Sequence, residues 1–453
     1  MRRLGLLFAL MVPVLSACSM EPVINHQVVD YLNVSAIASN QTILQNILRA
    51  RDGAPLHFGE FADIRGALSA NVSVNSTVPY GPIGVSTTKP RNLLTAGMTV
   101  SSSPSFDIDS LDTQDFTKGV MSSISPGTAE FFLNEGIDYR MVLMLLVAGV
   151  QPAGSPEMLL NAPNSARIVC YKQKPGPNAV ASDYTILAAD QPCSGFAEPE
   201  YYAFLRIVNN SGRLYPVTLK GTPKPVGAPF NIDMNKDLKA IAAIDPSKYT
   251  LAKTKTGQFQ LVTAKRASTI ILCSDRNGTP TVVGSLTNAA SEATKIPLNA
   301  CMPKNPADAA DDSEAVPSTA KLPLATNAVQ FQLRSTLEVI QYVGQVMAFQ
   351  QQQTAAHPDL PERCITLEYE NLNGPTCNGG VLFHLQNNGP NPFDQANSVS
   401  YNGETWSLPA PAICTDPDRC DHTLQTMSII SLLLNENKSA KDINTTQAVQ
   451  VVP

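Results

Sequence analysis

Apolar residues that recur every three or four positions predict amphipathic helices in several parts of the chain. Between His26 and Arg51 this pattern runs up to Asp52-Gly53-Ala54-Pro55, where a glycine and a proline end it. Between Asn327 and Gln353 the apolar positions form one continuous stripe, which predicts a single long helix. Further helices are predicted within residues 116–150, which end in a buried apolar run at 141–150, and over residues 201–208 and 423–435.

Segments in which apolar and polar residues alternate predict β-strands. Ala166–Tyr171 and Asp183–Ala188 predict two strands, and Tyr249–Cys273 predicts a three-stranded meander. Asn402-Gly403 between two alternating runs is a strong signal for a hairpin. Further strands are predicted over residues 70–78, 92–108, 213–219, 365–369, 381–385 and 446–452. Together these elements predict an α+β fold, with amphipathic helices packed on antiparallel sheet and several small β units tied by disulfides.

The composition excludes two broad classes of protein. Only 15% of the 453 residues are charged and 43% are hydrophobic, whereas a disordered chain has high charge and few apolar groups. The formal net charge is −6, whereas a nucleic-acid-binding protein needs a basic face for phosphate. We therefore expect a folded protein with no nucleic-acid partner.

The first residues form an export signal. Arg2 and Arg3 precede an apolar run from Leu4 to Leu15, and small residues follow, as in a secretory signal peptide. The run is shorter than the about 20 residues that a helix needs to cross a bilayer. Twin-arginine export is disfavoured because the residues after Arg3 fit that motif poorly.

The end of this signal carries a more specific motif. Leu15-Ser16-Ala17-Cys18 resembles the lipobox of bacterial lipoproteins. The resemblance implies that Cys18 begins the mature chain and carries the lipid on its thiol, and that Ser19 directs the protein to the outer membrane of a Gram-negative bacterium. An ordinary secretory peptide with a chance cysteine is the alternative. The partners expected are thus the membrane, through the N-terminal lipid, and another protein of the envelope.

The chain divides into regions of different composition. Residues 303–323 are rich in Ala, Asp and Pro and hold almost no large apolar group, so they cannot bury enough surface to fold. Only Ser19–Asn25 lies between the lipid cysteine and the first predicted helix, a reach of at most about 25 Å. We predict a signal peptide over residues 1–17, a lipid-anchored tether over 18–25, an α+β region over 26–214, a β-rich region over 215–302, an acidic linker over 303–323 and a C-terminal α+β region over 324–453.

Eight of the nine cysteines follow the lipid site, and an even number in an exported protein predicts a disulfide framework. Many connectivities are possible, and the spacing favours four local pairs. Zinc is the open alternative at Cys414-x₅-Cys420-Asp421-His422, although the chain has no Cys-x₂-Cys, which structural zinc sites usually contain. The favoured pairs are Cys170–Cys193, Cys273–Cys301, Cys364–Cys377 and Cys414–Cys420.

Signatures of common enzymes are absent from the sequence. It contains no Gly-x-Ser-x-Gly, no phosphate-binding loop, no Gly-x-Gly-x-x-Gly and no His-Glu-x-x-His, so we predict no catalytic residue, no cofactor and no metal site. Three weak matches leave alternatives open. Ser318-x-x-Lys321 with Lys255-Thr256-Gly257 is a weak match to a penicillin-binding enzyme. The pair Glu368 and Glu370 is a weak match to a glycosidase, and Asp233-x-Asn235-x-Asp237 is a weak match to a calcium loop.

Four short sequence segments after the signal peptide resemble a group of uncharacterised envelope proteins of Gram-negative bacteria. They are Asn46–Ala50, Asp115–Gly119, Leu333–Ser335 and Val399–Gly403. That resemblance implies no activity and no site. We therefore predict an outer-membrane-anchored lipoprotein that acts as a non-enzymatic structural, assembly or binding component of the envelope. An envelope hydrolase with an active site dispersed along the sequence is the alternative.

Overall fold

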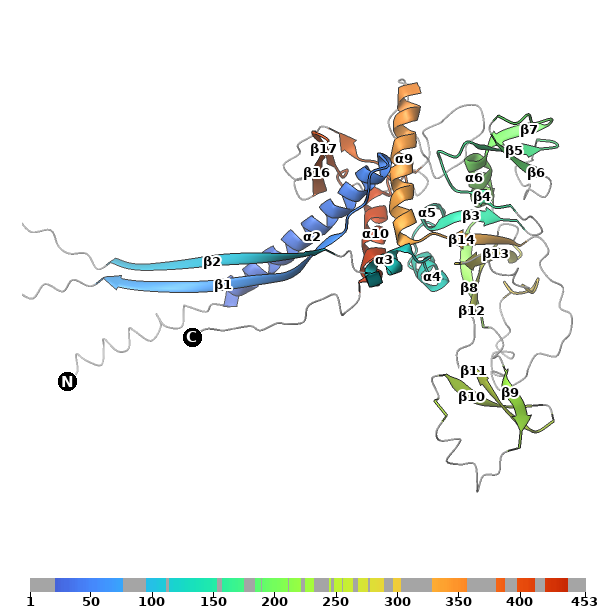
Figure 1. Cartoon of the computed structure of the whole chain (residues 1–453), viewed down its shortest axis with the longest axis horizontal. Coiled ribbons are helices and arrows are strands. Elements are labelled where there is room, and N and C mark those ends of the chain that lie inside the picture. The colour runs from blue at the N-terminus through green and yellow to red at the C-terminus, as the bar shows by residue number, and fades with distance from the viewer. Residues whose placement is uncertain are drawn as a thin grey trace, which may run out of the picture. The chain divides into compact units, whose positions relative to one another are not determined.

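The computed structural model has a mixed α+β fold, as predicted, and its sheets are mostly antiparallel (Figure 1). The chain forms two compact units, one from Met1–Thr42, His57–Thr117 and Lys438–Pro453, the other from Ile43–Leu56 and Lys118–Asn437. The structure describes residues 21–75, 95–110, 114–152, 157–174, 184–188, 190–210, 212–220, 225–231, 244–245, 248–254, 256–263, 268–275, 278–288, 296–302, 328–356, 380–387, 397–411 and 420–438.

The first unit contains a long helix and a long two-stranded ribbon. Helix α2 (Glu21–Arg51) belongs to this unit up to Thr42. The helix ends at Arg51, as the sequence predicts. Strands β1 (Gly59–Asn75) and β2 (Thr95–Ser110) pair antiparallel along their whole lengths, with one bulge between Phe61 and Asp63 (Figure 1). Strand β1 begins at Gly59, earlier than the predicted start at residue 70, and β2 ends at Ser110, beyond the predicted end at residue 108.

The second unit is organised around a six-stranded sheet of order β4-β3-β14-β13-β12-β8. Strand β14 pairs parallel with β13 and antiparallel with β3, so it joins the two halves of the sheet. These strands come from three of the regions that the composition separates, which therefore share one sheet. Their bounds are β3 (Val147–Gln151), β4 (Leu159–Leu160), β8 (Leu214–Lys220), β12 (Ser268–Ser274), β13 (Thr281–Thr287) and β14 (Val329–Leu333).

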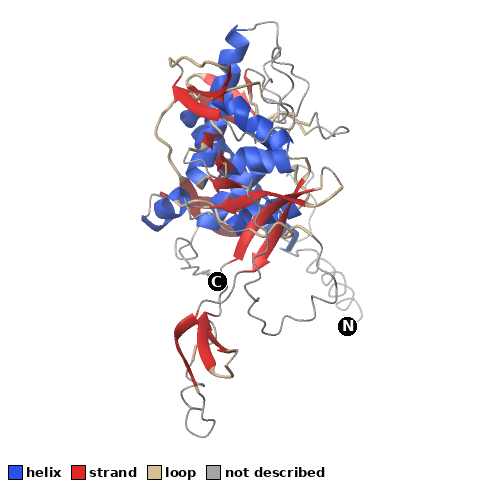
Figure 2. Ribbon diagram, turned by 90° about the vertical axis from the view of Figure 1, so that its right-hand side faces the viewer, coloured by secondary structure: helices blue, strands red, loops and turns tan. Residues whose placement is uncertain are grey.

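Helices of this unit contact the sheet and one another. Helices α4, α5 and α6 contact strands of the six-stranded sheet, and α10 contacts α9. Figure 2 shows the helices in blue beside the strands in red. Every residue of α5 from Met141 to Leu146 is buried, which makes this helix the centre of the core. The helix bounds are α3 (Gln114–Met121), α4 (Pro126–Asn134), α5 (Tyr139–Leu146), α6 (Glu200–Asn210), α9 (Thr336–Ala356) and α10 (Thr423–Asn437). Among the described residues no helix is both long and apolar enough to cross a bilayer.

Three smaller sheets complete the described fold, and each has three strands. The predicted meander over residues 249–273 is wrong, because β12 leaves β10 and β11 and joins the six-stranded sheet. Ile271 and Leu272 are both fully buried, as in a strand covered on both faces. The sheets are β5 (Arg167–Tyr171) with β6 (Tyr184–Ala188) and β7 (Phe196–Pro199), β9 (Pro225–Phe230) with β10 (Tyr249–Lys253) and β11 (Phe259–Thr263), and β15 (Gln386–Asn387) with β16 (Ser398–Tyr401) and β17 (Glu404–Ser407).

The single helix predicted over residues 327–353 is also wrong at its start. Residues 329–333 form strand β14 with alternating burial, and the helix begins only at Thr336. Ser335 and Glu338 form a reciprocal capping box, in which the Ser335 N–H donates to Glu338 Oε2 (2.7 Å) and the Glu338 N–H donates to Ser335 Oγ (3.2 Å). The apolar run over residues 141–150 divides in the same way, into α5 and β3.

A glycine lets the end of α2 approach α9 closely. A Cβ atom on Gly344 would lie 2.6 Å from the backbone nitrogen of Arg51 and 2.7 Å from the Cβ of Ala50. Real Cβ atoms do not approach backbone so closely, so only glycine fits this helix contact. The predicted hairpin at Asn402-Gly403 is confirmed, and both turn residues have positive φ (52° and 83°).

Two predicted disulfides are present. Cys170 in β5 pairs with Cys193, and Cys273 in β12 pairs with Cys301, with Cα separations of 5.6 and 5.7 Å. The second bridge lies in a core cluster with Ile271 and Ile296. Disulfides form and persist in oxidising compartments, so the protein is extracytoplasmic.

Candidate functional site

A pocket of about 430 Å³ lies between α4 and α10. Helix α4 provides one wall, and the last turns of α10 provide the other. The lining combines apolar side chains with one carboxylate and two hydroxyl groups. It consists of Ser125, Gly127, Thr128, Phe131, Phe132, Leu432 and Glu436.

The polar edge of this pocket is built from the N-terminus of α4. Ser125 caps the helix, because its Oγ accepts from the Thr128 N–H (3.1 Å), and Pro126 follows at the first helical turn. The Thr128 hydroxyl donates to Glu436 (3.1 Å to Oε1) and lies 2.8 Å from Ser125 Oγ. The carboxylate is therefore held beside the positive end of α4, where the helix dipole favours it.

The apolar part of the pocket is open to solvent. Phe131 is 52% exposed and Leu432 is 50% exposed, while Phe132 is buried beneath them. The two phenylalanine rings meet edge to face, with centroids 5.5 Å apart. An apolar side chain with an adjacent cation or N–H donor matches this arrangement. The lining contains no histidine, cysteine or lysine, and Glu436 is its one ionisable side chain.

The structure also pairs a histidine with a carboxylate that the sequence does not connect. His384 Nδ1 lies 3.3 Å from Asp421 Oδ2 and 3.3 Å from Thr423 Oγ1, and its backbone N–H donates to Thr423 Oγ1 (3.1 Å). His384 is buried, and its Nε2 has no hydrogen-bond partner in the part of the chain that is described. These contacts fix the start of α10 to residues 381–384, and no serine or cysteine among the described residues completes a catalytic triad.

The carboxyl group of this pair gives an expected acid sensitivity. Burial opposes the charged form of Asp421, but hydrogen bonds from His384 and Thr423 outweigh burial and lower its pKa to about 2. The stabilisation is therefore complete above pH ~4 and is lost as pH falls toward ~2, on the order of 1 kcal/mol after solvent screening. Urea unfolding across this range should show a steeper loss of stability in the wild type than in Asp421→Asn. Equal slopes would remove Asp421 as a source of acid sensitivity.

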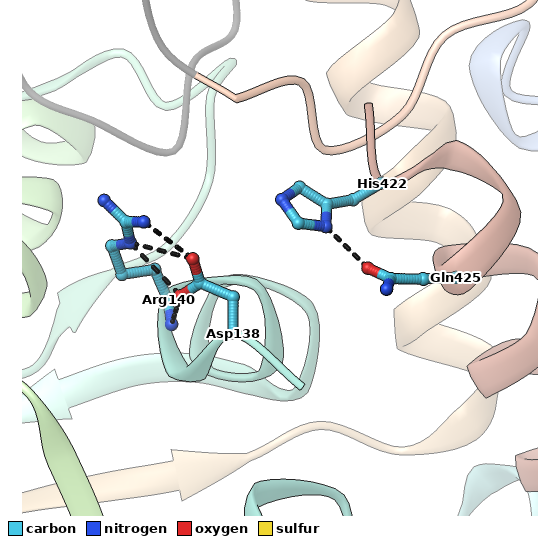
Figure 3. A network of polar contacts seen from close by, with 4 residues as sticks. All are labelled: Asp138, Arg140, His422 and Gln425. Carbon is cyan, nitrogen blue, oxygen red and sulfur yellow. Dashed lines mark hydrogen bonds and ion pairs between the residues drawn. The ribbon is translucent and has the colours of Figure 1, made fainter. Parts of the chain in front are cut away.

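Figure 3 shows two further polar pairs, which make separate contacts. Asp138 caps α5 by accepting from the Arg140 N–H (2.9 Å), and the Arg140 guanidinium also contacts the Asp138 carboxylate (2.6 Å). His422 Nδ1 lies 2.6 Å from Gln425 Oε1 within the first turn of α10. Both pairs stabilise the beginnings of helices.

The remaining sequence candidates have different outcomes. Cys420 is disulfide-bonded, which counts against a zinc thiolate there, while its predicted partner Cys414 lies outside the described residues. Over the residues that the structure describes, no group of three or more His, Cys, Asp or Glu is placed to hold a metal ion. The lipid site Cys18, the pair Cys364 and Cys377, the carboxylates Glu368 and Glu370, the calcium-loop residues 233–237, and Lys255, Ser318 and Lys321 all lie outside the described residues.

Sequence reasoning missed the pocket because its two walls are far apart in the chain. Ser125-Pro126 is a visible helix start, and this signal could have placed the N-terminus of α4. Nothing in the sequence brings Glu436 to that helix, because this contact depends on tertiary packing.

The body's resemblance to uncharacterised envelope proteins stays a prediction. Comparison of the chain with known protein families, with curated proteins and with solved structures found no match.

Proposed function

We propose that this protein is a lipid-anchored, non-enzymatic assembly component of the outer membrane that docks another envelope protein through the α4–α10 pocket. The carrying observation is the exposure of Phe131 and Leu432 around a fixed carboxylate. Soluble surfaces seldom present two large apolar side chains around a built recess without a binding role. The lipobox supports the anchor, and the two disulfides support an oxidising compartment.

The partner's chemistry follows from the pocket. Burying one leucine-sized side chain contributes about 1.5–3 kcal/mol, and the open ring of Phe131 offers the surface for it. Glu436 favours a lysine or arginine next to that side chain, and the net charge of −6 also favours a basic partner. We therefore infer that the partner inserts an apolar residue flanked by a basic one.

Photo-crosslinking in intact cells tests this proposal. A benzoylphenylalanine at Phe131 should crosslink to one envelope protein, at a peptide that contains an apolar residue beside Lys or Arg. Leu432→Asp should reduce this product at least about tenfold, because it places a charge where the partner's apolar side chain would bind. Glu436→Gln should weaken it less and should reduce its salt sensitivity.

Leu298 provides a matched control, since it is 55% exposed and does not line the pocket. Leu298→Asp should leave the crosslink unchanged. Cys18→Ala should release the protein from the membrane and remove the lipid seen by mass spectrometry. A crosslink that survives Leu432→Asp would exclude the pocket as the docking site, and an unacylated wild-type protein would exclude the anchor.

A further inference from the structure

The ribbon formed by β1 and β2 is unusually long for a sheet that has only two strands among the described residues. Its strands have 17 and 16 residues, and among the described strands each pairs only with the other. A lone two-stranded ribbon is marginally stable in water, and its outer edges present rows of unpaired N–H and C=O groups. Each copy of the chain therefore offers two open edges of nearly equal length.

The register divides the residues of the ribbon between two faces. Opposite residues share a face, and successive residues alternate. One face takes Ile64↔Phe106, Ala70↔Val100 and Val72↔Met98, while the other takes Ser69↔Ser101 and Asn71↔Thr99. Apolar residues thus gather at one set of alternating positions of the register, and polar residues gather at the other.

The ribbon also lacks the usual protection against edge pairing. Residues 66–75 and 95–106 contain no charged residue, although natural edge strands are commonly guarded by lysine or other charges. All the charged residues lie at the end near α2 in sequence, at Glu60, Asp63, Arg65, Asp107 and Asp109. Copies of the ribbon therefore meet no electrostatic repulsion over most of its length.

Pro104 shows which backbone groups face outward. Proline has no N–H, so the pair Gly66↔Pro104 is a non-hydrogen-bonded pair. Hydrogen-bonded and non-hydrogen-bonded pairs alternate, so Ser102 in β2 and Ala70 in β1 also direct their N–H groups away from the ribbon. Both edges can therefore accept a further strand, and Pro104 itself interrupts only one position.

We propose that the ribbon is a self-assembly surface, in which the β2 edge of one copy pairs antiparallel with the β1 edge of the next copy of this chain. Copies that point the same way keep all strands antiparallel and keep the apolar faces on one side. The matched strand lengths and the absence of charge favour a second copy over an unrelated strand. Such a head-to-tail contact is heterologous, so it closes into a ring or continues as a filament. This inference goes beyond the proposed function, because it adds self-assembly to the docking of another envelope protein, and it depends on neither the lipid nor the pocket.

Edge-blocking variants of the full chain in detergent test this proposal. The wild type should be larger than a monomer by light scattering, and Ser102→Pro and Ala70→Pro should each need at least about tenfold more protein to assemble. Each proline removes an outward N–H and leaves the pairing inside the ribbon intact. The matched controls Ser102→Ala and Ala70→Ser keep that N–H and should assemble like the wild type.

Disulfide trapping between copies tests the direction of the contact. Copies that carry Ser69→Cys should crosslink when mixed with copies that carry a cysteine on the same face of β2, at Ser101, Ser103 or Ser105, and neither population should crosslink alone. A monomeric wild type, proline variants that assemble like their controls, or β1–β1 crosslinks would each overturn the proposal. A monomer that binds vesicles or another protein through the ribbon would also overturn it. Leu432→Asp should leave the oligomer intact, so failure of the docking pocket is distinguishable from failure of this surface.

Discussion

Replacing Arg334 with methionine should lower the free energy of unfolding of the second unit by about 2–5 kcal/mol, because buried carbonyls lose their donor. Arg334 lies between β14 and α9 and is only 5% exposed. Its Nη1 donates to the carbonyls of Met144 (3.0 Å) and Leu145 (3.2 Å), and its Nη2 donates to the carbonyl of Asn161. The side chain thus ties the end of α5 and the segment after β4 to the sheet.

The charges of the nearby Tyr342 and Glu338 side chains favour the charged form of Arg334 and raise its pKa against the effect of burial. Its guanidinium lies 3.8 Å from the ring centre of Tyr342, and burial lowers its pKa only to about 10. Methionine fills the volume but removes this donor from three buried carbonyls. The Met144 carbonyl keeps the Asn161 amide as a second donor (2.8 Å), and each carbonyl left unpaired costs about 1–3 kcal/mol. Lysine should rescue little, because one ammonium group cannot reproduce the planar fork.

Urea unfolding monitored by circular dichroism measures this loss. Lys248→Met is the control, because Lys248 is 70% exposed and its ion pair with Asp245 is a surface pair. The control should change stability by less than about 0.5 kcal/mol. A loss below about 1 kcal/mol in Arg334→Met would show that water or a rearrangement satisfies the three carbonyls.

Breaking the buried ion pair of Arg206 and Glu198 should have a similar effect. Arg206 in α6 lies 2.5 Å from Glu198 in β7, and both side chains are buried. The guanidinium also donates to the Tyr171 hydroxyl and lies 4.9 Å from the centre of that ring. Burial and the Glu198 charge raise the pKa of Tyr171, so Tyr171 stays neutral. Arg206→Met leaves Glu198 buried without its cation, which should cost about 3–5 kcal/mol.

A double-mutant cycle separates the pair from the cost of isolating one charge. The double variant Arg206→Met with Glu198→Leu should recover most of the stability that either single change loses, because an apolar pair avoids the desolvation penalty. Thermal unfolding of the four proteins provides the measurement. Additive losses would mean that the two charges do not stabilise each other.

The parts of the fold that the sequence predicts are those with local signals. Asp52-Gly53 ends α2, Asn402-Gly403 forms the turn of β16 and β17, and closely spaced cysteines form two of the disulfides. Each depends on a few neighbouring residues, whose backbone preferences survive in any tertiary context. Cys18 is predicted from a motif alone, and its role remains a prediction.

The parts that local patterns miss are decided by distant residues. Val329, Phe331 and Leu333 fit the stripe of a helix as well as the alternation of a strand, and pairing with β3 and β13 makes them a strand. The capping box at Ser335 and Glu338 was the local sign that the helix begins later. Glu436 and His384 reach their partners only after packing, so no spacing could assign them to a site.

The position of β14 in the six-stranded sheet also governs when the second unit can fold. Strands β3 and β4 lie on one side of β14, and β13, β12 and β8 lie on the other, yet β14 is the last of them in the chain. During synthesis the two halves must therefore wait until residue 333 arrives, with Val150 in β3 and Leu286 in β13 still without Phe331, their shared partner in β14. Contacts so distant in sequence make folding slow, and uncovered apolar strands aggregate readily. The yield of folded protein should thus depend more on a chaperone that protects the nascent or newly exported chain than on the stability of the final fold.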